Sequence, residues 1–442
     1  MSKGLRIPGL AAGAGIMLLA SGLAVHGADG DAYWPQWRGP EANGVARNAD
    51  PPLEWSETRN VRWKVEIPGR GSGSPVIWDD RIYLLTAIPE GVTGEAAHAP
   101  RGGVPQRGVH QFAVLAIDRR DGRVVWQRVA REEEPHEAAH HLNATWASGS
   151  AVTDGDQVFA FFESRGLYAY DRDGRLLWQT DLGDKYMRDQ FGDGTTPVLH
   201  GNYLVLLWDH QQDSFIVAFD KRTGKELWRT ERDEITSWAT PLIVEHEGRA
   251  QVVTSGANRL RSYDLETGRL IWESEGVTES PIPSPVAGEG MVVVTSGGRS
   301  GNRLQAIRLA GAEGDISGTG AIAWTLDRDT PHVPSPLLYD GILYLLKGNT
   351  GILSAFDVSG GRPHYELQRL DGVDEAFSSP VGAAGRVYVT GRDGTTLVLR
   401  HGPTFEVLAR NALDDEFDAS PALVDREIYL RGNRYLYRIE AE

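Results

Sequence analysis

The sequence predicts an all-β fold, an eight-bladed β-propeller of four-stranded antiparallel blades, and three observations support this prediction. A short unit recurs eight times along the chain. In most units a polar turn precedes a strand-like run that ends at an aromatic residue. The 52 glycines among 442 residues indicate many tight turns rather than long helices. Self-similarity at a fixed period is the signature of a repeat architecture, so it decides the fold class before any single motif does.

Each unit begins where a small polar residue precedes proline, or alanine in one case, at the start of an apolar run. The eight pairs are Ser74-Pro75, Ser150-Ala151, Thr196-Pro197, Thr240-Pro241, Ser284-Pro285, Ser335-Pro336, Ser379-Pro380 and Ser420-Pro421. Their second members are 76, 46, 44, 44, 51, 44 and 41 residues apart. A period of roughly 40–45 residues suits one four-stranded propeller blade.

The turn motif is clearest in "AFDKRTGKELW", which ends at Trp228. It recurs as "AIDRRDGRVVW", "AYDRDGRLLW" and "SYDLETGRLIW", and in a weaker form as "AFDVSGGRPHY". The aspartate can bond the backbone of the turn, the glycine supplies a positive φ, and the aromatic residue falls on the next strand. The motif therefore predicts a β-hairpin in each blade.

The N-terminus reads as a secretory signal over residues 1–28. Lys3 and Arg6 form its basic start, an apolar stretch follows, and small residues near Ala28 form its exit. The alternative is a retained membrane anchor, although glycines interrupt the apolar run. No other segment is apolar enough to cross a bilayer. We therefore expect a periplasmic or secreted protein with no membrane span after signal removal.

Residues 29–60 lead into the propeller, and residues 61–442 are expected to form it as a single domain. The eighth unit, Ser420 to Ile439, has room for only three strands. The strand-like run "VRWKVEI", residues 61–67, has no partner before it. We predict that it is the outer strand of the last blade, because this overlap would close the ring and remove exposed sheet edges. A monomer is expected.

Two loops depart from the repeat. Residues 88–110, "IPEGVTGEAAHAPRGGVPQRGVH", lengthen the first unit, and insertions of this kind often lie on a binding face. In the fifth unit "RLAGAEGDISGTGAIAW" replaces the tight turn with a longer polar loop. This second loop is interpreted as a tolerated variation.

A set of residues a few positions before the unit starts is predicted to surround the mouth of the central channel, where inner strands begin. They are Arg70, Trp146, Asp193, Trp238, His332, Glu375 and Asp418. Aromatic faces with a few convergent polar groups are typical of small-molecule sites. Two interpretations stay open: these residues bind a small polar or aromatic ligand, or they line an ordinary solvated channel.

The segment "HEAAH", His136 to His140, matches the H-E-x-x-H pattern of zinc proteases. On a helix the two histidines would share one face, with Glu137 placed as a general base. No second helix follows to supply a third ligand. The alternatives are a metal site that includes His136, His140 and His141, or a solvated polar loop.

The repeated A-x-D-x-x-T-G-x-x-x-W motif resembles the blade signature of pyrroloquinoline quinone (PQQ) enzymes and their non-enzymatic relatives. This resemblance implies that the outer-strand tryptophans dock between adjacent blades. The residues that match are Trp63, Trp126, Trp178, Trp228, Trp272 and Trp324. The opening "WPQWRGPEANGVA", residues 34–46, is similar to that of a group of uncharacterised secreted bacterial proteins with these repeats.

Two kinds of relative imply different functions. Quinoprotein alcohol dehydrogenases carry a vicinal disulfide, a calcium site and an aspartate base, and this chain has no cysteine and no segment that matches the calcium site. Outer-membrane assembly lipoproteins are periplasmic, non-catalytic propellers anchored through a cysteine. We expect a non-catalytic scaffold or binding protein of the cell envelope without a cofactor. The alternative is an oxidoreductase that uses PQQ with calcium to oxidise alcohols or sugars.

The charge of the chain limits its partners. The formal net charge is -16, and phosphate binding needs a clustered basic face. Nucleic acid is therefore not expected as a partner. An envelope protein or a small polar ligand is expected instead.

Overall fold

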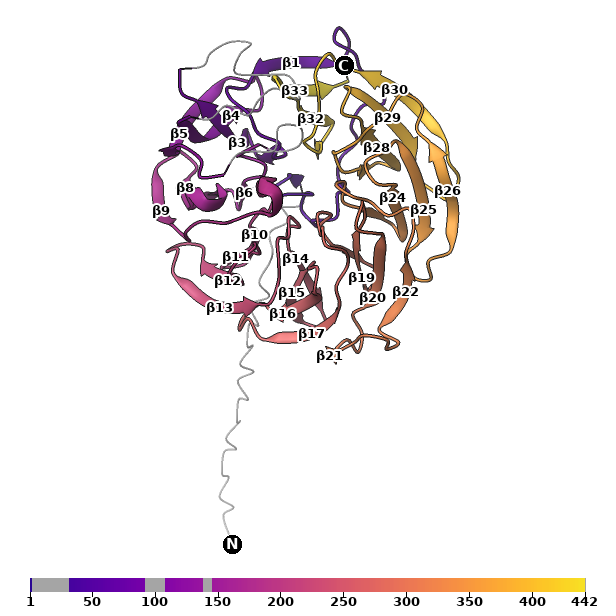
Figure 1. Cartoon of the computed structure of the whole chain (residues 1–442). Coiled ribbons are helices and arrows are strands. Elements are labelled where there is room, and N and C mark those ends of the chain that lie inside the picture. Colours follow the sequence, from indigo (N-terminus) through magenta and orange to yellow (C-terminus); the bar gives the residue numbers. More distant parts are fainter. Residues whose placement is uncertain (2–31, 92–107, 138–144, 442) are drawn as a thin grey trace.

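Eight β-sheets surround a central axis like the blades of a propeller (Figure 1). The structure is a computed structural model that describes residues 1, 32–91, 108–137 and 145–441. These residues contain 33 strands and two short 3-10 helices, η3 (Glu163–Arg165) and η4 (Arg188–Gln190). The predicted eight-bladed all-β fold is confirmed. The predicted signal, residues 1–28, lies outside the described residues except for Met1.

Blades 1 to 4 follow one another along the chain, each written here from its inner to its outer strand. Blade 1 consists of β2 (Val76–Trp78), β3 (Arg81–Pro89), β4 (His110–Asp118) and β5 (Val124–Glu133). Blade 2 consists of β6 (Val152–Thr153), β7 (Gln157–Phe161), β8 (Leu167–Asp171) and β9 (Leu176–Thr180). Blade 3 consists of β10 (Val198–His200), β11 (Tyr203–Trp208), β12 (Ser214–Asp220) and β13 (Glu226–Arg232). Blade 4 consists of β14 (Leu242–His246), β15 (Arg249–Thr254), β16 (Arg259–Asp264), β17 (Leu270–Glu275) and a fifth strand, β21 (Gly314–Asp315).

Blades 5 to 8 complete the circle. Blade 5 consists of β18 (Val286–Gly288), β19 (Met291–Ser296), β20 (Arg303–Arg308) and β22 (Ile322–Leu326). Blade 6 consists of β23 (Leu337–Tyr339), β24 (Ile342–Leu346), β25 (Ile352–Asp357) and β26 (Pro363–Arg369). Blade 7 consists of β27 (Val381–Ala383), β28 (Arg386–Thr390), β29 (Thr395–Arg400) and β30 (Val407–Ala412). Blade 8 consists of β31 (Ala422–Val424), β32 (Glu427–Arg431), β33 (Tyr435–Glu440) and β1 (Val61–Glu66).

The ring closes through β1, as the sequence predicts. β1 pairs antiparallel with β33, with Lys64 opposite Tyr437 and Glu66 opposite Tyr435. Both ends of the propeller therefore meet in blade 8, which lies at the top of Figure 1. Since the first strand completes the last sheet, the closure uses backbone hydrogen bonds that neither terminus could make alone.

The small polar residues at the unit starts form a closed ring of hydrogen bonds. The backbone N–H of each one donates to the side-chain oxygen of its counterpart in the next blade. The bond from Ser74 to Ser150 is 2.9 Å long, and the bond from Ser420 back to Ser74, which closes the circle, is 3.0 Å long. The other six bonds join Ser150, Thr196, Thr240, Ser284, Ser335, Ser379 and Ser420 in order, at 2.9 to 3.1 Å. We call these eight residues the hydroxyl ring.

At the rim, outer-strand tryptophans join five of the eight blades to the next blade. Trp228 donates its indole N–H to the carbonyl of Leu265 at 2.8 Å, and its ring lies against Gly268. Gly268 has φ +68°, and a Cβ there would lie 2.5 Å from the indole. The glycine of the turn is therefore needed both for the backbone conformation and for the space that the ring occupies. Equivalent N–H···O=C bonds occur at Trp63, Trp126, Trp178 and Trp324.

Trp272 docks in a different way from the other five tryptophans. Its indole N–H donates to Oε1 of Gln251 within its own blade, at 3.1 Å. The reason is the loop that replaces the tight turn of blade 5: β21 pairs in parallel with β17, and Ile316 packs in the same cluster as Trp272. Trp272 is fully buried as a result. The long loop of blade 5 is thus a cover for this tryptophan rather than a neutral variation.

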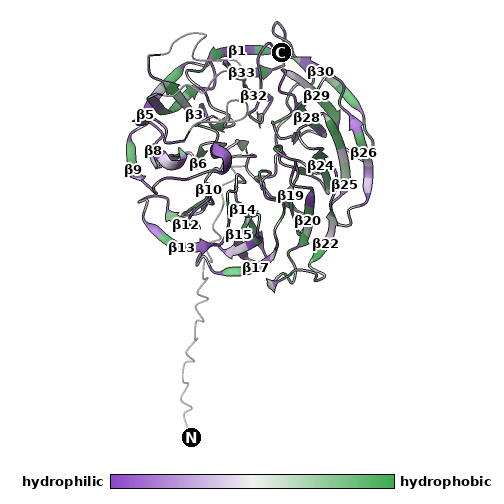
Figure 2. Ribbon diagram, viewed as in Figure 1, coloured by the Kyte–Doolittle hydropathy of each residue, from purple (hydrophilic) through white to green (hydrophobic). Residues whose placement is uncertain are grey.

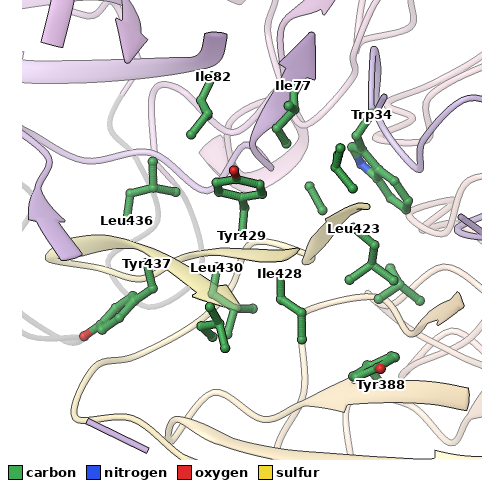
Figure 3. Close-up of a cluster of buried hydrophobic side chains, with 14 of the residues drawn as sticks. Trp34, Ile77, Ile82, Tyr388, Leu423, Ile428, Tyr429, Leu430, Leu436 and Tyr437 are labelled. Atoms are coloured by element: carbon green, nitrogen blue, oxygen red, sulfur yellow. The ribbon is translucent and has the colours of Figure 1, made fainter. Parts of the chain in front are cut away.

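Apolar side chains fill the space between neighbouring blades. In β19 every residue is buried, because a blade covers each face of the sheet, whereas β1 at the rim alternates between half-buried and exposed residues. The strands carry much of the hydrophobic colour in Figure 2. Figure 3 shows one such cluster, in which Trp34 lies beside Ile77 and Leu423. The N-terminal segment is therefore part of the core between blades 8 and 1.

No helix in the described ranges is long and apolar enough to cross a membrane.

Candidate functional site

A cavity of about 870 Å³ lies at the centre of the propeller. Most of its wall comes from the loops that precede the inner strands, and the N-terminal segment and the β19–β20 and β24–β25 loops complete it. Four members of the hydroxyl ring lie on its wall: Thr240, Ser284, Ser335 and Ser379. Cavities of about 300–1,000 Å³ are typical of small-molecule sites. The volume is thus sufficient for a ligand.

The N-terminal segment forms one wall of this cavity. Residues 34–46 contact several blades in turn: Trp34 pairs with Ile77 of blade 1, and the carbonyl of Pro35 accepts the N–H of Thr153 in blade 2. Trp37 lines the cavity and donates its indole N–H to Oγ of Ser284, at 3.3 Å. A segment from outside the repeats therefore contributes an aromatic ring to the cavity.

Arg38 fixes this segment in place. Its guanidinium donates to the carbonyls of Pro380 at 2.7 Å, Pro336 at 2.5 Å and Asn43 at 2.9 Å, and the residue is only 1% exposed. Burial lowers the pKa of Arg38 to about 9. Because two of its acceptors belong to blades 6 and 7, the motif "WPQWRGP" anchors the segment across the ring.

Four of the seven predicted channel residues line the cavity, namely Asp193, Trp238, His332 and Asp418. The other three lie elsewhere. The backbone of Arg70 bridges to Ala87. Trp146 packs against His110, with ring centroids 4.4 Å apart. Glu375 is exposed and forms an ion pair with Arg392, which in turn binds Asp418 on the cavity wall.

Asp193 belongs to a buried group of charged residues. Its Oδ2 accepts a hydrogen bond from Nζ of Lys185 at 2.5 Å, and both side chains are fully buried. Its Oδ1 accepts from the N–H of Gly194 and from both donors of Thr195, at 2.8 to 3.0 Å. The charge of this carboxylate is thus compensated inside the protein.

Glu163 lies beside this pair. Its Oε1 accepts the N–H of Asp193 at 3.2 Å, and Arg165 is 3.5 Å from its other oxygen. Burial, and then the negative charge of Asp193, raise the pKa of Glu163 to about 8. Glu163 is therefore protonated at neutral pH. Of Glu163 and Asp193, only Asp193 then carries a negative charge beside the two cations Lys185 and Arg165. A further acid, Glu133, lies 3.4 Å from Arg165.

Asp418 is compensated in the same way. Arg392 donates to both of its oxygens, at 2.6 and 3.1 Å, and to Oε2 of Glu375 at 3.1 Å. The guanidinium also lies 3.7 Å from the centre of the ring of Phe377. Arg392 is 4% exposed, so this bidentate pair is shielded from water and held in one orientation.

The loop between β9 and β10 extends over the cavity. It contains η4, and Arg188 at the start of η4 bonds to the carbonyl and to Oε2 of Glu279, at 3.1 and 3.0 Å. Trp238 donates its indole N–H to the carbonyl of Gly192 at 2.7 Å and packs edge-on against Phe191. These contacts tie the loop to blades 4 and 5 and place aromatic rings on the cavity wall.

His332 lies on the opposite part of the wall. Burial, and then the nearby charge of Arg299, lower its pKa, so the imidazole is neutral at pH 7. Its Nδ1 is 3.4 Å from Nδ2 of Asn349, whose oxygen accepts the N–H of Val333 at 3.0 Å. A neutral imidazole, an amide and the exposed guanidinium of Arg299 thus form the polar part of this wall.

The metal-site prediction falls partly outside the described residues, which do not include His140 and His141. Nε2 of His136 lies 2.9 Å from the carbonyl oxygen of Lys185, and Glu137 accepts the N–H of Met187 at 3.1 Å. In the described ranges no group of three His, Asp or Glu residues is placed to hold a metal. Residues 92–107 of the loop predicted to lie on a binding face are also outside the residues that the structure describes.

Several cavity residues were not predicted from the sequence. They are Trp37, Arg188, Phe191, Arg299, Asn349 and Phe377. The motif around Trp37 stood out in the sequence, but nothing in it showed that the segment reaches the channel. Arg188, Phe191 and Phe377 lie in loops between blades, whereas Arg299 and Asn349 lie in loops between the second and third strands of blades 5 and 6. The repeat pattern gives no signal in either kind of loop.

The cavity residues do not fit PQQ with calcium. Calcium needs six to eight oxygen ligands, several of them carboxylates. Asp193, which is buried, and Asp418, which is half-buried, already bind Lys185 and Arg392. Glu279, also on the wall, binds Arg188. A cation would have to displace these bonds.

Comparison with known proteins agrees with the architecture. The family model described as outer membrane protein assembly factor BamB matches residues 53–213 and 212–442. The protein of that name from Yersinia pestis is 28% identical over 218 residues, which cover 42% of this chain and 50% of that protein. The chain thus aligns with half the length of that relative.

Solved structures with low sequence identity show the same fold. BamB from Moraxella catarrhalis superposes with a TM-score of 0.58 at 14% identity, covering 86% of this chain and 99% of that one. Quinohemoprotein alcohol dehydrogenase from Comamonas testosteroni gives a TM-score of 0.61 at 11% identity, covering 92% and 80%. Because the family model matches nearly the whole propeller, this chain belongs to the family of PQQ-like propellers described as outer membrane protein assembly factor BamB.

Proposed function

We propose that this chain is an exported, non-catalytic propeller that acts as a scaffold or binding protein of the cell envelope. The observation that carries the proposal is the state of the carboxylates in the central cavity. Asp193 is bonded to buried Lys185, and Asp418 accepts hydrogen bonds from Nε and Nη2 of Arg392. A carboxylate held in this way is a poor general base and a poor metal ligand, because its charge is already compensated.

The family supports a role in the envelope. Relatives of this chain are named as assembly factors of outer membrane proteins, and we propose that its partner is also an envelope protein. A periplasmic or secreted location follows from this role together with the signal-like residues 1–28. The closed ring supplies the rigid frame that a scaffold needs, since the hydroxyl ring fixes each blade to the next and rim tryptophans add a bond at five of these junctions.

Reciprocal capture tests the partnership. The full chain with a C-terminal tag is used to enrich proteins from envelope extracts, and the enriched protein is then tagged and used to recover this chain. We expect one envelope protein to be recovered in both directions. Failure of every reciprocal capture would contradict the scaffold role.

A second experiment tests the quinone-dependent alternative. Purified chain is mixed with PQQ and calcium, and its melting temperature and dye-linked oxidation of methanol and glucose are measured. We expect neither a higher melting temperature nor oxidation. Oxidation that disappears in the double variant Lys185→Met/Asp193→Asn, which keeps the buried charge balanced, would overturn the proposal.

A further inference from the structure

The central cavity presents mostly uncharged groups, although many charged residues surround it. Three acids on its wall are bonded to cations of the protein: Asp193 to Lys185, Asp418 to Arg392 and Glu279 to Arg188. The fourth, Asp189, is exposed and lies 3.7 Å from Arg188. His332 is neutral at pH 7, as described above. A cationic ligand would have to compete with these internal bonds. Arg299, which is exposed on the wall, offers one positive charge to an anionic ligand.

The aromatic residues of the wall offer ring faces rather than N–H groups. The indole N–H of Trp37 is used by Ser284, and that of Trp238 is used by the carbonyl of Gly192. Both side chains are nevertheless only half-buried. Phe191 and Phe377 add two further rings. What remains available on these side chains is apolar surface.

The hydroxyl ring supplies hydrogen-bond donors on the same wall. Thr240, Ser284, Ser335 and Ser379 each use the side-chain oxygen to accept a backbone N–H of the preceding blade. Within the described ranges, no residue accepts a hydrogen bond from these four hydroxyls. The O–H groups are thus available to a ligand, together with the side chain of Asn349.

We propose that the cavity binds a neutral, polyhydroxylated ligand of the saccharide class. A sugar ring has C–H groups on its faces, which pack on aromatic rings, and hydroxyls at its edge, which exchange hydrogen bonds with hydroxyl and amide side chains. The cavity of about 870 Å³ is large enough for a disaccharide. Trp37 gives the N-terminal segment a direct part in this site. The site is independent of the protein partner proposed above.

Calorimetry with defined disaccharides tests the proposal on the full chain. Maltose, cellobiose and N,N′-diacetylchitobiose are titrated one by one, and saturation-transfer NMR shows whether sugar C–H protons contact the protein. We expect at least one of the three to bind with its C–H protons in contact. Binding of none of them would overturn the proposal.

Leucine substitutions locate the site. Trp238→Leu and Trp37→Leu remove a ring face and keep apolar volume, and we expect each to weaken binding by roughly tenfold or more. Phe191→Leu is a milder variant that keeps the loop intact if either tryptophan variant misfolds. Trp228→Leu is the matched control: the same residue type with the same kind of N–H···O=C bond, but at the rim. Equal loss of binding in the control and in the cavity variants would refute the location.

A charged probe tests the competing ligand class. Arg299 lines the cavity, is exposed, and has no ion-pair partner among the residues that the structure describes. Three results together would show that the site takes an aromatic carboxylate and that the proposal is wrong. Benzoate binds, Arg299→Gln abolishes the binding of benzoate, and none of the disaccharides binds. Disaccharide binding that Arg299→Gln leaves unchanged supports it. Neither result depends on the capture of an envelope protein.

Discussion

The hydroxyl ring makes a prediction that can be worked out from single hydrogen bonds. Ser150 is 2% exposed, and its Oγ accepts the N–H of Ser74 at 2.9 Å. Ser150→Ala removes this acceptor and leaves a buried N–H without a partner, since Ser74 is also 2% exposed. An unsatisfied buried donor costs about 1–3 kcal/mol. We expect a loss of this size in the free energy of unfolding, although only one oxygen atom is removed.

Ser150→Thr is the matched control. Two members of the ring, at positions 196 and 240, are threonines that make the same bond, so the hydroxyl of the new residue can take the position of Oγ. The backbone N–H of residue 150 still donates to Thr196 in both variants. The difference between alanine and threonine therefore isolates the bond from Ser74.

Urea unfolding at equilibrium, followed by tryptophan fluorescence and by circular dichroism, measures the effect, and coincident transitions justify a two-state treatment. A loss of 1 kcal/mol lowers the melting temperature by about 2–4 °C in chains of 150–250 residues, and by less in a longer chain. If Ser150→Ala is as stable as Ser150→Thr, the N–H of Ser74 has another acceptor and the ring does not hold the blades together.

Substitutions at Trp228, Glu163 and Lys185 test the rim and the buried charges. Trp228→Ala should cost about 3 kcal/mol and Trp228→Phe about 1 kcal/mol, because phenylalanine keeps the packing and loses only the N–H bond; equal losses in urea unfolding would contradict this. Glu163 has a pKa of about 8 when folded, above its ordinary value of 4.5, so the stability of the wild-type chain falls as the pH rises between these values. Glu163→Gln has no such proton, so its free energy of unfolding relative to that of the wild type should rise by up to about 4 kcal/mol between pH 5 and 8. If the difference in stability between the two chains stays constant with pH, the pKa of Glu163 is not raised. Lys185→Met leaves the charge of Asp193 uncompensated and should lower the free energy of unfolding by about 3–5 kcal/mol. Adding Asp193→Asn to this variant should restore most of that stability. Thermal unfolding of the single and double variants checks both expectations.

The sequence indicated the rim contacts because they are local and repeated. In "AFDKRTGKELW", Asp220 accepts the N–H of Arg222 and Thr223, and Gly224 has φ +69°, as the turn chemistry requires. The same residue types at the same spacing in other units place each tryptophan on an outer strand. Trp272 was the exception, because its neighbouring blade lacks the tight turn.

The cavity could be predicted only in part. Asp193, Trp238, His332 and Asp418 lie three or four residues before the second member of their unit-start pairs, so the repeat placed them near the axis. Arg70, Trp146 and Glu375 occupy similar positions in the sequence but do not line the cavity. These three lie five residues before the second member of their unit-start pairs, and a shift of one or two residues is enough to turn a side chain away from the cavity.

The sequence by itself determined the number of blades, the turns within them and the strand that closes the ring, because each depends on short-range patterns of hydrophobicity, glycine and proline. It also marked the eight small polar residues at the unit starts. Only the tertiary structure decided what these residues do, since the acceptor for seven of the N–H groups lies 41 to 76 residues further along the chain. For the bond that closes the circle, the N–H of Ser420 donates to Ser74 near the start of the propeller. The same holds for Trp37, and for Lys185 opposite Asp193: these contacts depend on how irregular segments cross the ring, and no periodic pattern encodes that path.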